Sequence, residues 1–347
     1  MAWRVKFNRD TARGFLGVLL ACVIIVGIDL VKPGISSAPD FDCSNSQSQE
    51  VVIDVSQGES GSSIASELYA AGVVKSSNAF FRIAVSDPRA ASIAPGLHRI
   101  EKNLCASTAL DQLLDRSRIE NLIAIPEGAW SSEVFASLNR LGYSDKEIRA
   151  ASQSVSLPNG FTSLEGLLFP AQYSFDSSTS LVSILSSMVK RAQSEMVKAG
   201  FGSTTESIST RDLLIIASLV QAEGDSQDYR KISQVVRNRL KIGMPLQFDS
   251  TVHFIKGSRG SVFLSTQSTL INSPFNTYRR TGLPPTPINN PGADALYAAS
   301  HPENGAWLYF ITVAPGDTRF TDSYQQFGEW KVLYKKNLRA GKFGSGK

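Results

Sequence analysis

The stretch Leu213-Leu-Ile-Ile-Ala-Ser-Leu-Val-Gln-Ala-Glu223 is apolar on nearly every side and ends on a carboxylate. Ser209, followed three residues later by Asp212, predicts a helix N-terminus, because both side chains can accept hydrogen bonds from first-turn amides. A helix with apolar residues around its whole circumference is typical of a buried helix. Within it, Ser218 is expected to bond back to a backbone carbonyl.

Such a helix would bring Glu223 to the edge of a core. Desolvation there raises the pKa of a carboxyl group, which can then stay protonated near neutral pH and act as a general acid. The alternative from this stretch alone is that the helix simply ends in solvent at Glu223.

The composition indicates an ordinary globular protein. With 347 residues, 42% of them hydrophobic and 19% charged, the chain is long enough for two or more domains. Of the net charge of +4, residues 1–13 supply +3, from four basic residues and one acidic residue, which leaves +1 for the rest. This distribution argues against a nucleic-acid-binding surface.

Residues 14–31 (GFLGVLLACVIIVGIDLV) form an apolar run that predicts a single transmembrane helix. The basic segment 1–13 precedes it, so we expect the N-terminus in the cytoplasm and the remainder outside, in a single-pass protein of the cell membrane. Residues 32–50, rich in Ser and Pro, are predicted to be a linker. A cleaved signal peptide and a lipoprotein signal around Cys22 are the alternatives.

Cysteine and histidine usage gives little support for metal or cofactor chemistry. Cys43 and Cys105 would lie in an oxidising compartment and could pair, a point that the sequence leaves open. The three histidines are scattered, and neither a phosphate-binding loop nor a Gly-x-Ser-x-Gly elbow occurs. We therefore expect no metal and no cofactor.

Periodicity divides the remaining chain into two α+β modules. Residues 51–118 predict a small β-α-α-β unit, with strands at 51–55 and 96–100 and helices at 62–71, 78–86 and 107–114. Residues 119–347 predict a larger module, with a strand that stops at Pro126 and a buried strand at 307–313. Its expected helices are 131–141, 145–152, 181–198, the one ending at Glu223, 229–240, 293–300 and 325–338.

Residues 281–292 (TGLPPTPINNPG) contain four prolines, which makes the segment stiff, extended and suited to form the wall of a groove. Between this segment and Glu223, polar residues follow breaks in the apolar pattern. They are Gln247, Asp249, Thr251, Asn276 and Tyr278.

Six motifs in this order resemble the YceG-like (MltG) family of endolytic murein transglycosylases. They are Ile-Pro-Glu-Gly at 125–128, the apolar motif at 164–170, the helix at 215–223, and the segments 238–249, 276–278 and 282–292. The resemblance implies a single-span protein with a LysM-like module at 51–118 and a catalytic domain at 119–347. It also implies cleavage of nascent peptidoglycan strands near the membrane, which leaves 1,6-anhydro-N-acetylmuramic acid ends, and it admits cell-wall synthases as partners.

Carried over residue by residue, the family's catalytic glutamate falls on Glu223, which would serve as both acid and base. The substrate-binding candidates are Gln221, Gln247, Asp249, Thr251, Asn276, Tyr278 and Glu165. Several have a structural alternative: Asp249 suits an Asx-turn, Tyr278 a core position and Glu165 an anchoring contact. Gln221 stands where the family has a glutamate.

Two other functions remain open on the sequence. A hydrolytic muramidase would use the same Glu223 but leave water-added reducing ends instead of anhydro ends. A non-catalytic scaffold would bind peptidoglycan through residues 51–118 and position synthesis enzymes.

Overall fold

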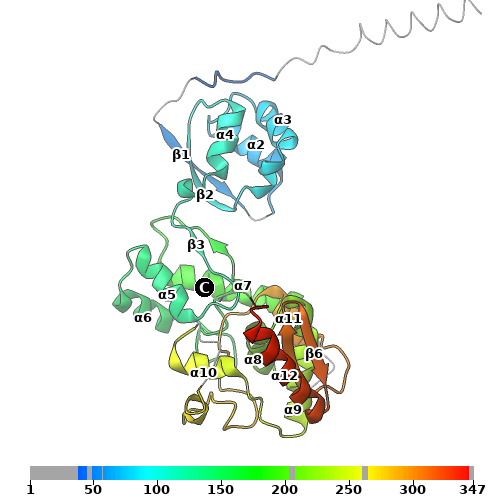
Figure 1. The fold of residues 1–347 in the computed structure, drawn as a ribbon. Helices are drawn as coiled ribbons and strands as arrows, with labels where there is room; N and C mark the ends of the chain where they lie inside the picture. The colour runs from blue at the N-terminus through cyan, green and yellow to red at the C-terminus, as the bar shows by residue number, and fades with distance from the viewer. Residues whose placement is uncertain (1–37, 45–48, 57, 203–207, 260–264, 344–347) are drawn as a thin grey trace, which may run out of the picture. The chain divides into compact units, whose positions relative to one another are not determined.

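The computed structural model describes residues 38–44, 49–56, 58–202, 208–259 and 265–343. The predicted cytoplasmic segment and the transmembrane helix at 14–31 lie outside these ranges. Within them, no helix combines the length and apolar character needed to cross a bilayer. The chain divides into two compact units, residues 1–119 (the N-unit) and 120–347 (the C-unit), which together give a mixed α+β protein (Figure 1).

The N-unit places three helices against an antiparallel pair of strands. β1 and β2 pair from Glu50 opposite Glu101 to Val55 opposite Gly96. Ser60 and Ser76 cap α2 and α3 by accepting first-turn amides, as N-cap serines do. The described elements are β1 (Glu50–Val55), α2 (Gly61–Ala70), α3 (Ser77–Ser86), η1 (Pro88–Ser92), β2 (Gly96–Glu101), α4 (Ala106–Leu114) and η2 (Arg116–Arg118). The strands and helices predicted between 51 and 114 are thus confirmed to within one residue.

Two contacts tie the start of the described chain to α4. Cys43 and Cys105 form a disulfide, which answers the question that the sequence left open. Cys105 precedes α4 and offers no side-chain cap. Both carboxylate oxygens of Asp40 instead accept the Ala106 amide at 3.1 Å, so a residue far away in sequence caps this helix.

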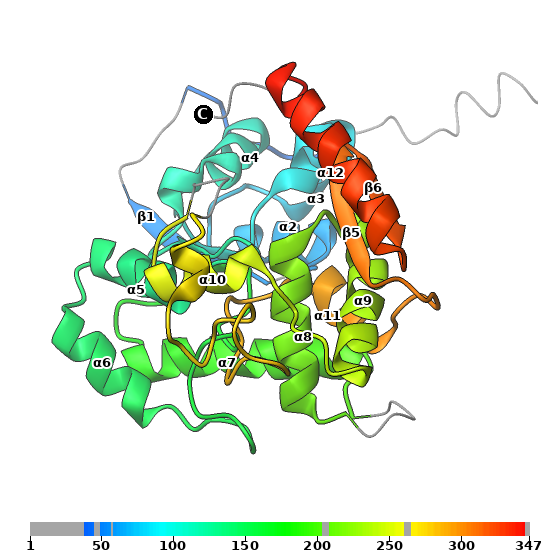
Figure 2. The ribbon, with the colours of Figure 1, turned by 60° about the horizontal axis from the view of Figure 1, so that its bottom comes forward.

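The C-unit is built around α8, with α9, α10 and α11 beside it and α7 packed against α6 and α11 (Figure 2). Leu213 to Val220 are all buried, and Ser209 accepts the Asp212 amide at 3.1 Å, so the predicted buried helix and its start are confirmed. The described elements are β3 (Ile123–Ala124), α5 (Ser131–Arg140), α6 (Asp145–Ser154), β4 (Gln172–Tyr173), α7 (Leu181–Lys198), α8 (Thr210–Glu223), η3 (Ser226–Asp228), α9 (Tyr229–Lys241), α10 (Asp249–Lys256), η4 (Ser268–Leu270), α11 (Ala293–Ser300), β5 (Tyr309–Ala314), β6 (Asp317–Thr321) and α12 (Tyr324–Arg339).

Ser218 fastens the proline-rich segment to α8. Its hydroxyl donates to the Ile215 carbonyl at 2.8 Å, which confirms the predicted back-bond. The same hydroxyl accepts the Ile288 amide at 3.1 Å, and the Ser218 carbonyl accepts Nδ2 of Asn289 at 2.8 Å. One small polar residue in an apolar helix therefore positions two consecutive residues of the neighbouring segment.

Three local features differ from what the sequence led us to expect. Asp249 begins α10 rather than forming an isolated turn, and β6 was not predicted at all. The strand predicted as buried at 307–313 is β5, in which only Val313 is fully buried. The reason is that, in the part of the chain that the structure describes, β5 pairs only with β6, and a two-stranded hairpin cannot cover both faces of its strands.

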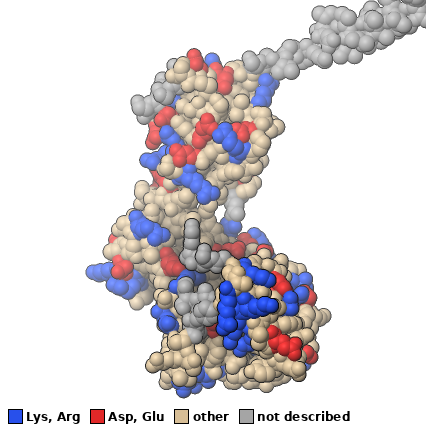
Figure 3. All heavy atoms as spheres, viewed as in Figure 1, with Lys and Arg blue, Asp and Glu red and all other residues tan. Residues whose placement is uncertain are grey.

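Charged side chains are distributed differently on the two units (Figure 3). On the face shown, Lys and Arg gather over part of the C-unit, whereas both signs are interspersed on the N-unit. Four exposed basic side chains of the C-unit lie on α12, at Lys331, Lys335, Lys336 and Arg339.

Gly166 lies where the apolar 164–170 motif meets the proline-rich segment. Its φ is +87°, and an added Cβ would lie 2.6 Å from Cβ and Cγ of Pro287. Gly160 has the same φ, but no atom of the described residues lies within 4 Å of an added Cβ. The two glycines form a matched pair that separates backbone strain from steric overlap.

We expect Gly160→Ala to lower the free energy of unfolding by about 1–2 kcal/mol, through its left-handed backbone alone. Gly166→Ala should cost a further 1–3 kcal/mol or so, because the proline cannot move aside easily. Urea unfolding of both variants measures the difference. Equal costs would show that the contact with Pro287 is not tight.

Candidate active site

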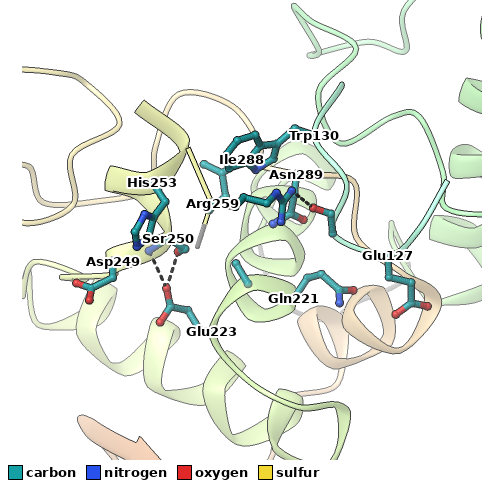
Figure 4. A pocket seen from close by; sticks show the side chains of 12 residues that line it. Glu127, Trp130, Gln221, Glu223, Asp249, Ser250, His253, Arg259, Ile288 and Asn289 are labelled. Carbon is teal, nitrogen blue, oxygen red and sulfur yellow. Dashed lines mark hydrogen bonds between the residues drawn. The ribbon is translucent and has the colours of Figure 1, made fainter. Parts of the chain in front are cut away.

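A pocket of about 380 Å³ opens at the C-terminal end of α8 (Figure 4). This volume is within the usual range for small-ligand sites, about 300–1,000 Å³. Its walls come from the end of α8, the first turns of α10, the loop before α5 and the proline-rich segment. The lining residues are Glu127, Gly128, Trp130, Gln221, Ala222, Glu223, Asp249, Ser250, His253, Arg259, Ile288 and Asn289.

Glu223 is the last residue of α8, and the sequence explains why the helix stops there. Gly224 follows with an extended backbone, φ −165°. A Cβ at Gly224 would lie 2.3 Å from Cδ1 of Ile232, so the absence of a side chain lets α9 pack against this turn. The chain therefore leaves the helix immediately after Glu223, and the carboxylate faces the pocket instead of continuing into the core.

The carboxylate meets the N-terminus of α10. The Ser250 hydroxyl donates to Oε1 of Glu223 at 2.5 Å, and the Ser250 amide approaches the same oxygen at 3.4 Å. Dashed lines mark both contacts in Figure 4. First-turn amides of a helix have no partner within the helix and carry partial positive charge, so this position suits a carboxylate.

The pKa of Glu223 is raised to about 7. Burial is the largest cause: part of the side chain is exposed on the pocket, but protein atoms crowd the carboxyl group. The Ser250 hydroxyl opposes this increase, the charge of Asp249 adds to it, and Arg239 lowers the pKa again. The result is an acid whose two protonation states are both populated near neutral pH, as proton transfer in both directions requires.

Arg239 is a buried cation in the same electrostatic environment. Its guanidinium donates to the backbone carbonyls of Leu246 and Leu308 and lies over the rings of Phe248 and Tyr309. Burial lowers its pKa, and the charge of Glu223 raises it again. Among the described residues, carbonyls and aromatic rings hold Arg239 and no carboxylate forms a direct ion pair with it, so it acts on Glu223 from a distance.

One wall of the pocket is an aromatic ring stacked with a guanidinium. Arg259 lies 4.2 Å from the ring centroid of Trp130. It also donates to the Gly128 carbonyl at 2.6 Å and to the Glu133 carboxylate at 2.9 Å. These contacts fix a flat surface beside Glu223, of the kind against which a sugar ring can pack.

Two of the predicted substrate-binding residues line the pocket, and both also have partners within the protein. Asp249 accepts a short hydrogen bond from the Tyr278 hydroxyl. Gln221 donates to the Tyr229 hydroxyl at 2.7 Å and accepts the Gly292 amide at 2.9 Å. Gln221 thus links α8 to α9 and to the start of α11.

The other candidates lie outside the pocket lining, and two of them have internal partners that would have to break before a sugar could bind. Thr251 and Asn276 are fully buried, and their polar atoms bond within the protein, Thr251 to Phe248 and Asn276 to the carbonyls of Thr269 and Ile271. Gln247 is exposed, and its backbone N–H donates to the Thr277 carbonyl.

Glu165 has the anchoring role that the sequence offered as its alternative. Both of its oxygens accept the Ser131 amide, at 3.1 and 3.2 Å, where α5 begins. Burial raises its pKa to about 7, the same value as for Glu223. A raised pKa therefore does not identify the catalytic group by itself. Glu223 is the candidate because it lines the pocket, whereas Glu165 does not.

The sequence reasoning missed Ser250, Trp130, Arg259 and Asn289. Ser250 follows the motif at 238–249 and Trp130 lies just after the motif at 125–128, but the spacing of neither residue indicates a functional role. Asn289 is 3% exposed, and its Oδ1 has no hydrogen-bond partner within the described residues. Across those same residues, no group of three or more His, Cys, Asp or Glu is arranged to hold a metal ion.

The contacts of Gln221 predict the effect of a glutamate at this position. Gln221 adjoins Glu127, whose pKa is raised by burial and by Asp294, while Gln221 itself lowers it. A second carboxylate would raise the folded-state pKa values of both acids, so stability is lost as pH rises above about 4.5. We expect Gln221→Glu to be destabilised by about 1 kcal/mol at pH 8 and by less at pH 5.

Chemical denaturation at the two pH values measures this difference. Gln153→Glu, at an exposed site on α6, serves as the control and should show no comparable pH dependence. A Gln221→Glu variant equally stable at both pH values would contradict the prediction.

Comparisons with known proteins identify the family of the chain. The model of the YceG-like family matches residues 53–331. An endolytic murein transglycosylase of Bacillus subtilis strain 168 is 32% identical over 306 residues, which are 82% of this chain and 84% of that protein. One from Streptococcus pneumoniae strain D39 is 33% identical over 153 residues, 43% of this chain and 28% of its own length.

The crystal structure of a yceG-like protein from Listeria monocytogenes aligns with a TM-score of 0.51 at 21% identity. The alignment covers 82% of this chain and 99% of that one, and it shows a shared fold. The extent of the family match and of the Bacillus alignment establishes the relationship: the chain belongs to the YceG-like family.

Proposed function

We propose that this protein is an endolytic murein transglycosylase, a lyase that cleaves the β-1,4 bond between N-acetylmuramic acid and N-acetylglucosamine. The observation that carries the proposal is Glu223, a carboxyl group with a pKa of about 7 beside a pocket of suitable size. The names of the Bacillus and Streptococcus relatives support the same activity.

In the first step Glu223 acts as the acid. Its proton passes to the glycosidic oxygen as the bond from that oxygen to C1 of the muramyl residue breaks. The pKa near 7 keeps a large fraction of the carboxyl group protonated at neutral pH. The Trp130–Arg259 surface gives the sugar a flat wall to pack against while this occurs.

In the second step the resulting carboxylate acts as the base. It takes the proton of the muramyl 6-hydroxyl, whose oxygen forms the new bond to C1 and closes the 1,6-anhydro ring. Glu223 is then protonated again, and no water is consumed. Ordinary glycosidases need a second carboxylate for water or for a covalent intermediate, whereas this reaction needs one. The nearby Asp249 accordingly can remain bonded to Tyr278.

The proposal also includes features of the cellular setting. Residues 14–31 would anchor the protein in the cell membrane as a single span, with the catalytic C-unit outside the cytoplasm. The N-unit would be a LysM-like module that binds peptidoglycan. The substrate would then be nascent glycan close to the membrane, where cell-wall synthases are plausible partners. The apolar run, the elements of the N-unit and the family membership support this arrangement.

Replacement of the acid tests the assignment. Glu223→Gln should lower the rate of glycan cleavage by about 10²–10⁴-fold, because general acid–base catalysis contributes about that much. Mass spectrometry of the products should show anhydro ends with the wild type and almost none with the variant. Water-added reducing ends from the wild type would instead identify a hydrolytic muramidase.

Glu165→Gln is the matched control, because Glu165 has the same raised pKa but lies outside the pocket. It should keep most of the activity, since the glutamine oxygen can still accept the Ser131 amide. Equal losses in the two variants would mean that removal of any buried carboxyl group impairs the fold, and the assignment of Glu223 would fail.

The pH profile gives an independent check. Glu223 must be protonated to begin the reaction, so kcat/KM should fall as pH rises through about 7, by about tenfold per pH unit beyond it. Initial rates on soluble glycan strands between pH 5 and 9 measure this decrease. A rate that stays constant up to pH 9 would exclude an acid with this pKa.

A further inference from the structure

The two oxygens of Glu223 have different surroundings. Oε1 receives both contacts from Ser250, the hydroxyl at 2.5 Å and the amide at 3.4 Å. Within the described residues no hydrogen bond reaches Oε2. The amide can only donate, and the hydroxyl must donate when the carboxyl group is ionised, so Oε1 of the carboxylate accepts both contacts.

An oxygen that accepts two hydrogen bonds in this way is a poor place for a proton. A proton on Oε1 would point toward the amide hydrogen and would force the Ser250 hydroxyl to turn and accept. In the neutral acid the proton therefore belongs on Oε2, and Oε1 is the carbonyl oxygen. We infer that Ser250 is a positioning residue, which confines the transferable proton of Glu223 to Oε2.

This inference rests on the proposed function and specifies how Glu223 would carry it out. Oε2 releases its proton to the glycosidic oxygen and later takes the proton of the 6-hydroxyl, while Ser250 donates to Oε1 throughout. Both transfers then use one oxygen, so the leaving oxygen and the nucleophile must approach the same point in turn. The donors at the start of α10 stabilise the carboxylate between the two steps.

Other charged or titratable groups face the carboxyl group from each neighbouring element. Asp249 lies on α10 beside Ser250, Arg239 lies on α9, and Tyr278 comes from the loop that follows η4. His253 lines the same pocket one turn further along α10. Within the described residues none of them donates a hydrogen bond to Glu223, so the hydrogen bonds that distinguish the two oxygens come from Ser250.

The pH profile of Ser250→Ala separates a positioning role from a structural one. Loss of the hydroxyl removes a contact that lowers the pKa of Glu223, so the decrease of kcat/KM should move to higher pH, by at least about half a unit. If the substitution merely loosened the pocket, water would enter, and the decrease of kcat/KM would move to lower pH or stay at the same pH. Either of those results would overturn the inference.

Two further variants complete the comparison. Ser250→Thr keeps a hydroxyl and should restore the wild-type profile. Thr251→Val perturbs the same turn, where Thr251 bonds to the Phe248 carbonyl and to Thr277, but it leaves the Ser250 contact intact. It should lower stability without moving the pH profile. A shift in Thr251→Val equal to that in Ser250→Ala would count against a specific role for Ser250.

Infrared spectroscopy tests the proton position without any need for activity. At a pH well below 7 the C=O stretch of protonated Glu223 is identified by its absence in Glu223→Gln. A hydrogen bond to the carbonyl oxygen lowers the C=O stretching frequency. Removal of the hydroxyl in Ser250→Ala should therefore raise the frequency of this stretch. An unchanged or lower frequency would show that Oε1 carries the proton. If the frequency rises but the wild type forms no anhydro ends, the inference about Ser250 stands and the proposed function fails.

Discussion

The burial of α8 is the constraint on which the rest of the C-unit depends. Eight consecutive residues of this helix are buried, so neighbouring segments must cover it on all sides. α9, α10 and α11 pack against it, and the proline-rich segment is fastened to it through Ser218. The helix can end only where this cover stops. That end is Glu223, which explains why a carboxylate lies at the boundary between core and pocket.

The position of Glu223 then determines its chemistry. Burial alone would favour the neutral acid, which would then release its proton less readily. The N-terminus of α10 opposes this, because Ser250 donates to the carboxylate, and Arg239 adds a distant positive charge. Asp249 acts in the other direction. The pKa near 7 is therefore a balance between desolvation and a few nearby groups, and these groups come from α9 and α10 rather than from the helix that ends at Glu223.

Features that depend on residues close together in the chain could be predicted from the sequence, whereas contacts between distant segments could not. The buried helix, its N-cap at Ser209, its carboxylate and the back-bond of Ser218 all depend on residues within a few turns, and the pattern contained them. The elements of the N-unit were predictable for the same reason. The capping of α4 by Asp40 was not, because 66 residues separate Asp40 from Ala106, and neither residue carries a local signal of the contact.

The site was predictable only in part, for a related physical reason. Asn276 and Tyr278 are polar residues in a loop, which is how sugar-binding residues look, yet Asn276 holds its own loop together and Tyr278 bonds to Asp249. Conversely, Ser250 looks like one of many serines, and only the approach of α10 to α8 places it against Glu223. Local pattern shows which side chains are polar, whereas packing decides whether their partners are internal or external.

Gln221, where the resemblance leads us to expect a glutamate, shows how the same packing bears on a single residue. Its amide donates to Tyr229 and accepts from Gly292 at once, a pairing that requires one donor and one acceptor on the same side chain. An ionised glutamate only accepts, so it would depend on the Tyr229 hydroxyl turning to donate. It would also add a charge beside Glu127, whose pKa is already raised. Because Gln221 is neutral, it joins α8, α9 and α11 without adding negative charge to a pocket that already contains Glu127, Glu223 and Asp249.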